Sequence, residues 1–158
     1  MATQYIKVRG KAFWAQVFEQ NRDMEGWDGT AKEWNGQYLI NVALEGDSLM
    51  DLTASGSQAV DHMKEITGDD GTVYKVVRFK RRHEHRNRKG ELMEWASGAP
   101  KVVKDDGSPW VLDDDGLIGN TSDVECTVAV YDAGKNKGTR LQEVRILNHV
   151  PAPEKVSA

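Results

Sequence analysis

Alternation of apolar and polar residues with a period of two is the feature that most limits what this chain can form. It recurs in separate segments divided by glycine- and aspartate-rich turns, and the side chains of a β-strand point alternately to its two faces. The segments with this pattern are residues 5–18, 37–44, 72–85, 122–131 and 139–150. The pattern predicts a mostly β, mainly antiparallel domain.

One connection between these segments carries a helical signal. Residues 46–48 (GDS) offer an N-cap, and the apolar residues that follow continue the helix until Gly56 ends it. Residues 58–67 fit a helix and a strand equally well by periodicity. Five strands and one short helix predict a single OB-fold-like five-stranded antiparallel Greek-key barrel. An SH3-like barrel or a sandwich fits the periodicity nearly as well.

Two of the expected strands have features of their own. The strand at 72–85 is apolar at its start and almost entirely cationic at its end, and such an end meets water or phosphate because buried cations are costly. We therefore expect a long β-hairpin arm that projects into solvent near Lys89. The last strand, 139–150, needs a β-bulge for its apolar residues to share one face.

The length of 158 residues predicts one folded domain over residues 1–150, with residues 151–158 as a short flexible tail. A single cysteine, Cys126, excludes an internal disulfide and sits at an inward strand position, which predicts an inert core thiol. No apolar run approaches the ~20 residues that span a bilayer, and the first residues lack the apolar stretch of a secretion signal. We expect a cytoplasmic protein without membrane contact.

The net charge of −4 conceals a strong segregation of charge along the chain. Residues 1–16 carry +3 and residues 75–89 carry +7, whereas residues 17–70 carry −9 and residues 91–158 carry −5. Two separate cationic segments in an acidic chain favour a polyanionic partner. The alternative is a solvated basic hairpin beside acidic loops.

The first strand places its cations on one face. Ile6, Val8, Ala12 and Trp14 share the face expected to point into the core. The other face carries cations bracketed by aromatic residues, namely Tyr5, Lys7, Arg9, Lys11 and Phe13. In an OB barrel this strand and the one at 72–85 can be neighbours, which would merge the two cationic segments into one track.

Other clusters with chemical potential have simpler explanations. His83 and His85 lie on one side of a strand, but no third ligand is evident, so we expect them to extend the basic surface below about pH 6.5 rather than hold a metal. The aspartates at 105–106 and 113–115 offer oxygen ligands for Mg²⁺ in a nuclease. Aspartate–glycine clusters are also the ordinary composition of tight turns. We expect no catalytic residue, metal or cofactor.

Several short motifs follow one another along the chain. They are GKAFW at residues 10–14, a strand containing Tyr38, GAPKVV at 98–103 with DG at 106–107 and PW at 109–110, LIGNTS at 117–122 and GTRLQEV at 138–144. In their order and spacing they resemble the phage-encoded single-stranded-DNA-binding proteins with an OB fold, and the resemblance is strongest over residues 98–150. In this family an acidic C-terminal tail docks partner proteins, whereas residues 151–158 here contain Glu154 as their only acid, balanced by Lys155.

The resemblance implies sequence-independent binding of single-stranded DNA during phage DNA replication and recombination, with no enzymatic activity. Cations that follow phosphates and aromatic rings that stack on bases suit that task. The expected single-stranded-DNA-binding residues are Lys7, Arg9, Lys11, Phe13, Arg78, Lys80, Arg81, Arg82, Arg86, Arg88, Trp95 and Trp110. Replication or recombination proteins are further expected partners, and self-association stays open. The alternatives are a metal-dependent nuclease and an assembly protein whose basic arm threads into a neighbouring subunit.

Overall fold

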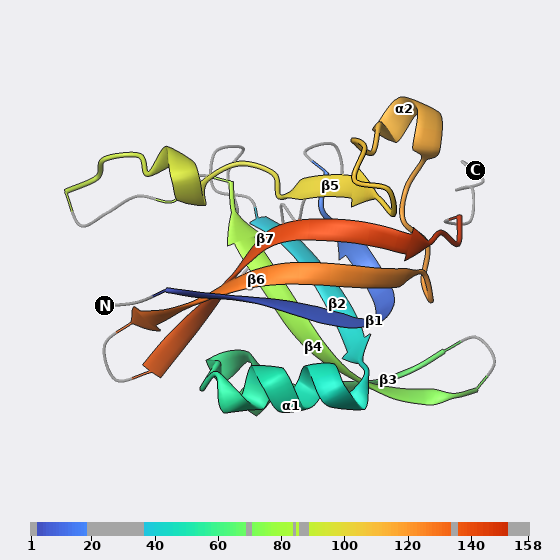
Figure 1. The fold of residues 1–158 in the computed structure, drawn as a ribbon, viewed down its shortest axis with the longest axis horizontal. Coiled ribbons are helices and arrows are strands. Elements are labelled where there is room, and N and C mark those ends of the chain that lie inside the picture. Colours follow the sequence, from blue (N-terminus) through green and yellow to red (C-terminus); the bar gives the residue numbers. More distant parts are fainter. Residues whose placement is uncertain are drawn as a thin grey trace, which may run out of the picture.

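The computed structural model describes residues 3–18, 37–68, 71–83, 85, 89–133 and 136–151, and its ribbon is drawn in Figure 1. Strands dominate it, and the helices are short. Its elements in chain order are β1 (Gln4–Gln16), β2 (Gln37–Leu44), α1 (Gly46–Ala54), η2 (Gln58–His62), β3 (Lys64–Thr67), β4 (Val73–Arg82), η3 (Glu94–Ala96), β5 (Lys101–Lys104), α2 (Leu112–Asp115), β6 (Asp123–Ala133) and β7 (Asn136–Asn148). None of the described helices is long and apolar enough to cross a membrane.

All seven strands belong to one mixed sheet with the order β3-β4-β2-β1-β6-β7-β5. Every neighbouring pair is antiparallel except β5 and β7, which are parallel. The mostly β class is confirmed, but the expectation of a five-stranded antiparallel barrel is wrong, because the sheet has two more strands and is not closed. The two additions are β5, which lies between the expected strands at 72–85 and 122–131, and β3, which covers the last four residues of the undecided stretch 58–67.

The core lies on the inner face of this coiled sheet. Inward side chains alternate along each long strand and bury their apolar surface, which is the main driving force for folding. The fully or nearly fully buried members include Val8, Ala12, Ile40, Val42, Leu52, Val77, Phe79, Val124, Cys126, Val128, Val130, Leu141, Val144 and Ile146. The inward position expected for Cys126 on β6 is therefore confirmed, and Tyr38 of β2 is buried as well.

Two further expectations are confirmed, except that the N-cap of α1 is Glu45 and not one of residues 46–48. Helix α1 spans Gly46–Ala54 and is followed by Gly56 in the left-handed conformation, with φ of 82°. The neighbours Thr127 and Val128 of β6 pair with Glu143 and Leu141 of β7, respectively. Gln142 is therefore the extra residue of the predicted bulge. The undecided stretch 58–67 divides into the 3₁₀-helix η2 and strand β3.

Strand β1 changes partner halfway along its length. Its residues Gln4 to Lys11 pair with β6, and its residues from Gly10 onward pair with β2. At Gly10 the neighbouring strand approaches so closely that an added Cβ atom would lie 2.1 Å from the carbonyl oxygen of Ala43. Gly10 is therefore required where the strand passes from one partner to the other.

A second irregularity in β1 overturns the expected positions of two aromatic residues. The pairing with β2 shifts between Phe13 and Gln16, and Trp14 adopts a left-handed backbone with φ of 49°. Trp14, expected in the core, is 52% exposed because this bulge carries it out of the alternation. Phe13, expected on an exposed cationic face, is only 2% exposed because it packs against Tyr74 of β4.

The expected long β-hairpin arm is also wrong for the described residues. β4 ends at Arg82, and the chain that returns towards it contains η3 and no strand of its own. The return is held by backbone hydrogen bonds, in which Met93 N–H donates to the His85 carbonyl and Gly98 N–H donates to the His83 carbonyl, each at 2.8 Å. Arg86 and Arg88 lie outside the described residues.

Candidate nucleic-acid interface

Three cations follow one another along the outer face of β4. Val77, Phe79 and Arg81 point to the inner face, so the alternation of the strand sends Arg78, Lys80 and Arg82 outward. We call Arg78, Lys80 and Arg82 the β4 cation row. Their arrangement fits one side of a phosphate backbone.

Arg78 is held in place by a buried amide. Its Nε donates to Oδ1 of Asn41 at 3.0 Å, and Nδ2 of Asn41 donates to the Phe13 carbonyl at 3.3 Å. Asn41 itself is 1% exposed, and Phe13, Asn41 and Arg78 pair across three neighbouring strands. The amide therefore ties one guanidinium of the row to the centre of the sheet, which limits its freedom before any ligand binds.

A pocket of about 270 Å³ opens beside this row. Arg78 and Lys80 form one wall, η2 forms another, and the start of β7 completes it. Its lining residues are Gln58, Ala59, His62, Arg78, Lys80, Gly138 and Thr139. We call it the basic pocket, because cationic groups and neutral residues make up the described lining, with no acid among them. Such a site suits a phosphate group.

The expectations had not included Gln58, His62 or Thr139 in this site. Periodicity left residues 58–67 undecided between helix and strand, and Thr139 lies in a strand 59 positions along the chain from Lys80. Only the tertiary structure brings η2 and the start of β7 beside β4. The alternation of β4, in contrast, was readable from the sequence.

Arg81 was expected to bind DNA as part of the solvent-facing cationic end of this strand, but the structure buries it. It points inward, is 9% exposed and donates to four acceptors on two segments. These acceptors are the carbonyls of Gly98 (2.9 Å), Ser97 (3.0 Å) and Leu141 (3.3 Å) and Oε1 of Gln142 (3.0 Å). Burial, and next the nearby Arg140, lower the pKa of Arg81 from its ordinary value. The side chain thus links β4 to β7 and to the returning segment as a structural tie.

The cations of β1 are exposed, but two of them are matched by acids on β6. Arg9 Nε contacts Oε2 of Glu125 at 2.8 Å, and Lys11 Nζ contacts Oδ1 of Asp123 at 3.1 Å. The hydrogen bond to Glu125 and the charge of that carboxylate raise the pKa of Arg9. These ion pairs offset two of the positive charges of β1, and exposed pairs of this kind add little stability.

The expected merging of the two cationic strands is wrong. β2 lies between β1 and β4, and the first half of β1, which carries Lys7, Arg9 and Lys11, pairs with β6 on the other side. Arg9 faces outward and Arg81 faces inward. The reason is the change of partner at Gly10, which directs the cationic half of β1 away from β4.

Among the aromatic residues that the structure describes, Tyr5 (64% exposed) and Trp14 (52% exposed) have the exposure that base stacking requires, and Trp14 is the one on the half of β1 that pairs with β2. The backbone N–H of Trp14 donates to Oδ1 of Asn120 at 2.8 Å. The preceding residue, Phe13, pairs with Asn41 of β2, which in turn pairs with Arg78 of β4. A left-handed backbone is costly for a residue with a large side chain, and such strain is found most often at functional sites. Strand periodicity missed this residue because Trp14 continues the alternation of Val8 and Ala12, so the apolar pattern of β1 does not reveal its bulge.

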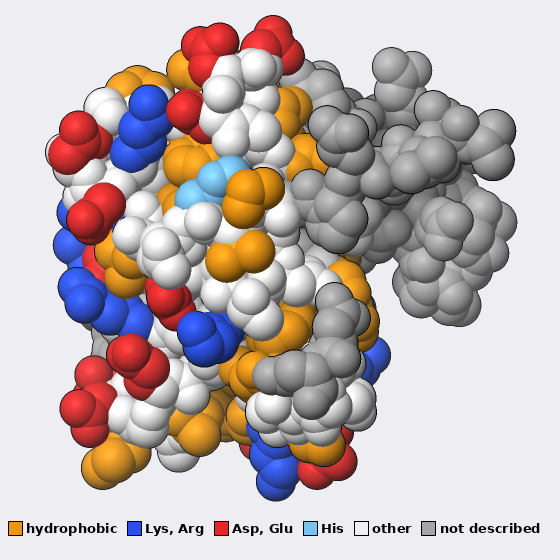
Figure 2. All heavy atoms as spheres, turned by 90° about the vertical axis from the view of Figure 1, so that its right-hand side faces the viewer, with side chains coloured by type: hydrophobic (Ala, Val, Ile, Leu, Met, Phe, Trp, Pro, Cys, Tyr) orange, Lys and Arg blue, Asp and Glu red, His pale blue; other side chains and the backbone are white. Residues whose placement is uncertain are grey.

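Trp110 instead closes one end of the core. Its Nε1 donates to the Gly116 carbonyl at 2.9 Å, and its ring meets that of His149 edge-on with 4.8 Å between centroids. Figure 2 views the end of the molecule that carries α2, where hydrophobic side chains gather around a histidine. Val111 and Leu117, both exposed, belong to this end. The side chain of Trp95 lies outside the described residues.

The other clusters have structural roles. His83 Nδ1 lies 2.8 Å from the hydroxyl of the buried Tyr38. Burial, followed by the charge of Arg82 and other guanidinium groups, lowers the pKa of His85 from its ordinary 6.5, so this ring gains charge at a lower pH than expected. Within the described part of the chain, no three histidine, cysteine or acidic side chains gather in a way that fits a metal ion.

The aspartate clusters mainly form turns. Asp106 accepts from both the backbone and the hydroxyl of Ser108, and Asp115 accepts from the backbone N–H of Val111. These hydrogen bonds hold the pKa of each carboxyl below its usual value. The expected turn at 113–115 is a single helical turn, α2.

Comparison with known proteins identifies solved structures with a similar fold. No protein-family model matches the chain, and no curated protein matches it. Solved structures do match: gp2.5, a single-stranded DNA binding protein encoded by bacteriophage T7, is 14% identical with a TM-score of 0.58, over 98% of this chain and 92% of that one. The single-stranded DNA-binding protein from bacteriophage Enc34 is 10% identical with a TM-score of 0.55, over 98% and 87% of the two chains.

The Enc34 protein has also been solved in complex with single-stranded DNA, and that structure matches with 11% identity and a TM-score of 0.55, over 94% of this chain and 88% of that one. The chain therefore has the fold of phage single-stranded-DNA-binding proteins. This confirms the resemblance that the motifs indicated.

Proposed function

We propose that this protein binds single-stranded DNA without sequence preference and protects it during phage DNA replication and recombination, as a binding protein and not as an enzyme. The observation that carries the proposal is the β4 cation row with the basic pocket beside it, on a fold shared with phage single-stranded-DNA-binding proteins. One of those proteins was solved with single-stranded DNA bound.

The chemistry of the site supports this function. Guanidinium and ammonium groups at Arg78, Lys80 and Arg82 neutralise phosphates, and phosphate contacts carry no sequence information of their own. An exposed aromatic ring stacks on any base, because every base has a flat face. Trp14 supplies such a ring, and it follows Phe13, which is linked to Arg78 through the strand pairing with Asn41.

The remaining residues of the expected set contribute differently. Lys7 is an exposed cation that extends the positive surface along β1, while Arg9 and Lys11 contribute less because Glu125 and Asp123 offset them. Arg86, Arg88 and Trp95 stay predictions of the sequence. Phe13 and Arg81 act through the fold rather than by touching DNA.

A titration with matched variants tests this proposal. A fluorescent oligothymidylate is titrated in EDTA at several salt concentrations, with anisotropy as the readout. Lys80→Ala/Arg82→Ala and Arg9→Ala/Lys11→Ala each remove two positive charges, so the overall charge change is the same. If the row contacts phosphates, the first variant loses about tenfold or more in affinity, and its salt slope falls by about 1.4, or about 0.7 for each contact.

The control variant separates a local site from general attraction. Arg9→Ala/Lys11→Ala is expected to stay within about threefold of the unaltered protein, since these residues lie on the half of β1 that pairs with β6, and β2 separates β1 from the β4 cation row. Equal losses in the two variants would contradict the placement of the site on β4. Absence of binding at low salt, or cleavage of the oligonucleotide after Mg²⁺ is restored, would overturn the function itself.

A further inference from the structure

The outer edge of β1 beside α1 is open over part of its length. At Arg9 the edge is occupied: the backbone N–H of Arg9 donates to Oγ of Ser48 at 2.8 Å, and its carbonyl accepts from the N–H of Glu45 at 2.9 Å. The backbone groups of Arg9 therefore face α1 and not β6.

The backbone groups of two residues nearer the N-terminus of the strand point the same way. In an antiparallel pair, successive residues alternate between bonding to the neighbour and pointing away from it. The pairing of β1 with β6 runs from Gln4 to Lys11 without a shift in register. Tyr5 and Lys7 therefore direct their N–H and carbonyl groups to the same edge as Arg9, where no described residue pairs with them.

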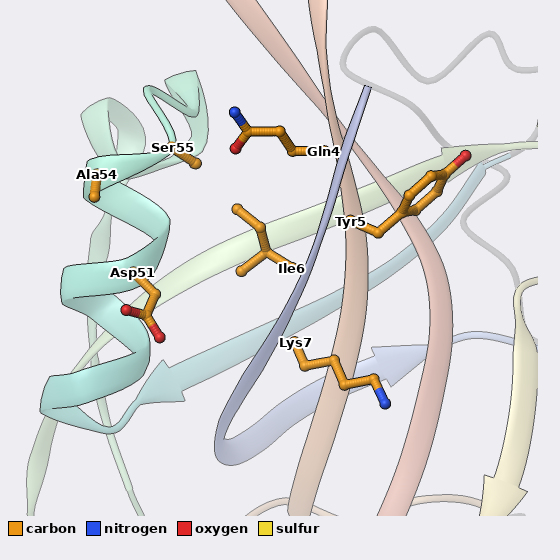
Figure 3. A pocket seen from close by; sticks show the side chains of 7 residues that line it. All are labelled: Gln4, Tyr5, Ile6, Lys7, Asp51, Ala54 and Ser55. Carbon is orange, nitrogen blue, oxygen red and sulfur yellow. The ribbon is translucent and has the colours of Figure 1, made fainter. Parts of the chain in front are cut away.

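A groove of about 420 Å³ lies along this open edge, and we call it the edge groove. Its walls are the edge of β1 and the last turn of α1, and Figure 3 shows Gln4 and Ile6 pointing towards the helix while Tyr5 and Lys7 point away from it. The lining residues are Gln4, Tyr5, Ile6, Lys7, Asp51, Ala54 and Ser55. This volume lies in the range of about 300–1,000 Å³ that is usual for ligand sites.

The charge of α1 selects between kinds of occupant. Asp51 of α1 is the only acid among the lining residues, and α1 contains no basic residue. Lys7, the one cation of the lining, points away from the helix (Figure 3). An acidic wall repels the phosphates of a polynucleotide and attracts a basic side chain. The open backbone groups supply hydrogen bonds for another extended backbone, which is how peptides add a strand to a sheet edge.

We propose that the edge groove binds an extended segment of a partner protein, which adds a strand to β1 at Tyr5 and Lys7 and places a basic side chain against Asp51. Four backbone groups on these two residues bind the backbone of the segment, and Asp51 of α1 favours a basic side chain in it. The site is separate from the basic pocket and does not depend on DNA binding.

Hydrogen exchange of the free protein tests the open edge first. The amides of Tyr5 and Lys7 exchange rapidly, whereas those of Ile6 and Val8, which bond to β6, are protected. Equal protection of all four amides would overturn the proposal, because the edge would then already be occupied.

Binding is tested by NMR titration with a synthetic peptide, acetyl-VKVKV-amide. We expect it to shift and protect the amides of Tyr5 and Lys7, and the acidic peptide acetyl-VEVEV-amide to do neither. Methylation of one peptide nitrogen that bonds to the edge weakens binding about fivefold, the value of one hydrogen bond. If oligothymidylate shifts these amides and the basic peptide does not, the groove is a DNA site and the proposal fails.

Matched helix variants locate the peptide. Ala54→Trp fills the groove and Asp51→Lys reverses its charge, and each abolishes peptide binding while oligothymidylate affinity stays within about twofold. Met50→Trp and Asp47→Lys make the same changes on α1 outside the groove lining and keep peptide binding. If the controls lose binding equally, or if the unaltered protein dimerises through this edge in light scattering and Ala54→Trp makes it monomeric, the proposed occupant is wrong.

Discussion

Arg81 and Arg82 are neighbours in the sequence and carry the same charge, but the alternation of β4 gives them different roles. Arg81 is buried and donates to backbone carbonyls of the returning segment and of β7, whereas Arg82 is exposed on the outer face. A guanidinium group suits both tasks, because its fixed fork satisfies several acceptors at once. Side-chain direction, and not residue type, separates the structural cation from the candidate DNA contact.

The two arginines allow a paired prediction. Arg81→Ala leaves buried carbonyls without donors, so the free energy of unfolding falls by about 3 kcal/mol and the melting temperature by about 6–12 °C. Arg82→Ala changes stability by about 0.5 kcal/mol or less and weakens DNA binding. Thermal melts of both variants measure this; equal melting temperatures would contradict the structural role of Arg81.

Trp14 gives a second prediction at this scale. Trp14→Ala removes the stacking surface and weakens oligothymidylate binding by about 1–3 kcal/mol, whereas Trp14→Phe keeps a ring and retains most of the affinity. Because the indole is half exposed, neither change greatly alters the melting temperature. Similar affinities for the alanine and phenylalanine variants would remove Trp14 from the site.

Strand β1 is the element on which the arrangement of the site depends. Its first half pairs with β6 and leaves an open edge beside α1. Its second half pairs with β2, whose Asn41 pairs with both Phe13 and Arg78. The passage between the two partners happens at Gly10, where β2 approaches most closely. A residue with a Cβ atom at this point forces the two strands apart.

Gly10→Ala therefore destabilises the protein. Its Cβ would lie 2.1 Å from the Ala43 carbonyl oxygen, which is backbone and moves only with β2. Overpacking of this kind costs about 1–3 kcal/mol. Gly46→Ala is the control, since nothing lies within 4 Å of its added Cβ and alanine favours a helix. Denaturant unfolding measures both; a stable Gly10→Ala variant would contradict the close approach of the strands.

For the molecule as a whole, Cys126 reports on the integrity of the sheet. It lies fully buried on β6, between β1 and β7, and burial raises the pKa of its thiol to about 12 from an ordinary 9.0. Because the folded form keeps the proton that the unfolded form loses, this group favours folding below pH 9.0, and that contribution is lost as the pH rises from there to about 12.

A thiol reagent measures how readily the sheet opens around Cys126. At pH 8 the native protein is expected to react with 5,5′-dithiobis(2-nitrobenzoic acid) only through global unfolding, since the central strands open last. The reaction rate then rises with denaturant in parallel with the unfolding constant. Rapid reaction of the native protein would show that β6 opens locally, which contradicts its central place in the sheet.

The sequence by itself determined the features that depend on local pattern. Period-two alternation identified most of the strands and the inward positions of β6, a glycine ended α1, and an uneven apolar pattern called for the bulge in β7. The cationic end of β4 was also evident from the sequence, but the expected set grouped Arg81 with Arg78, Lys80 and Arg82 and did not divide the strand into its two faces. These features follow from backbone geometry within a few residues, so the printed sequence contains what is needed to read them.

Only the tertiary structure decided which strands are neighbours and what covers each face. Two cationic strands were expected to join, but β2 separates them and acids on β6 match two of the charges. Phe13 and Arg81 are buried by residues distant in the chain, and Trp14 is exposed by a bulge. Burial and pairing depend on contacts between distant segments, which alternation along one segment does not encode.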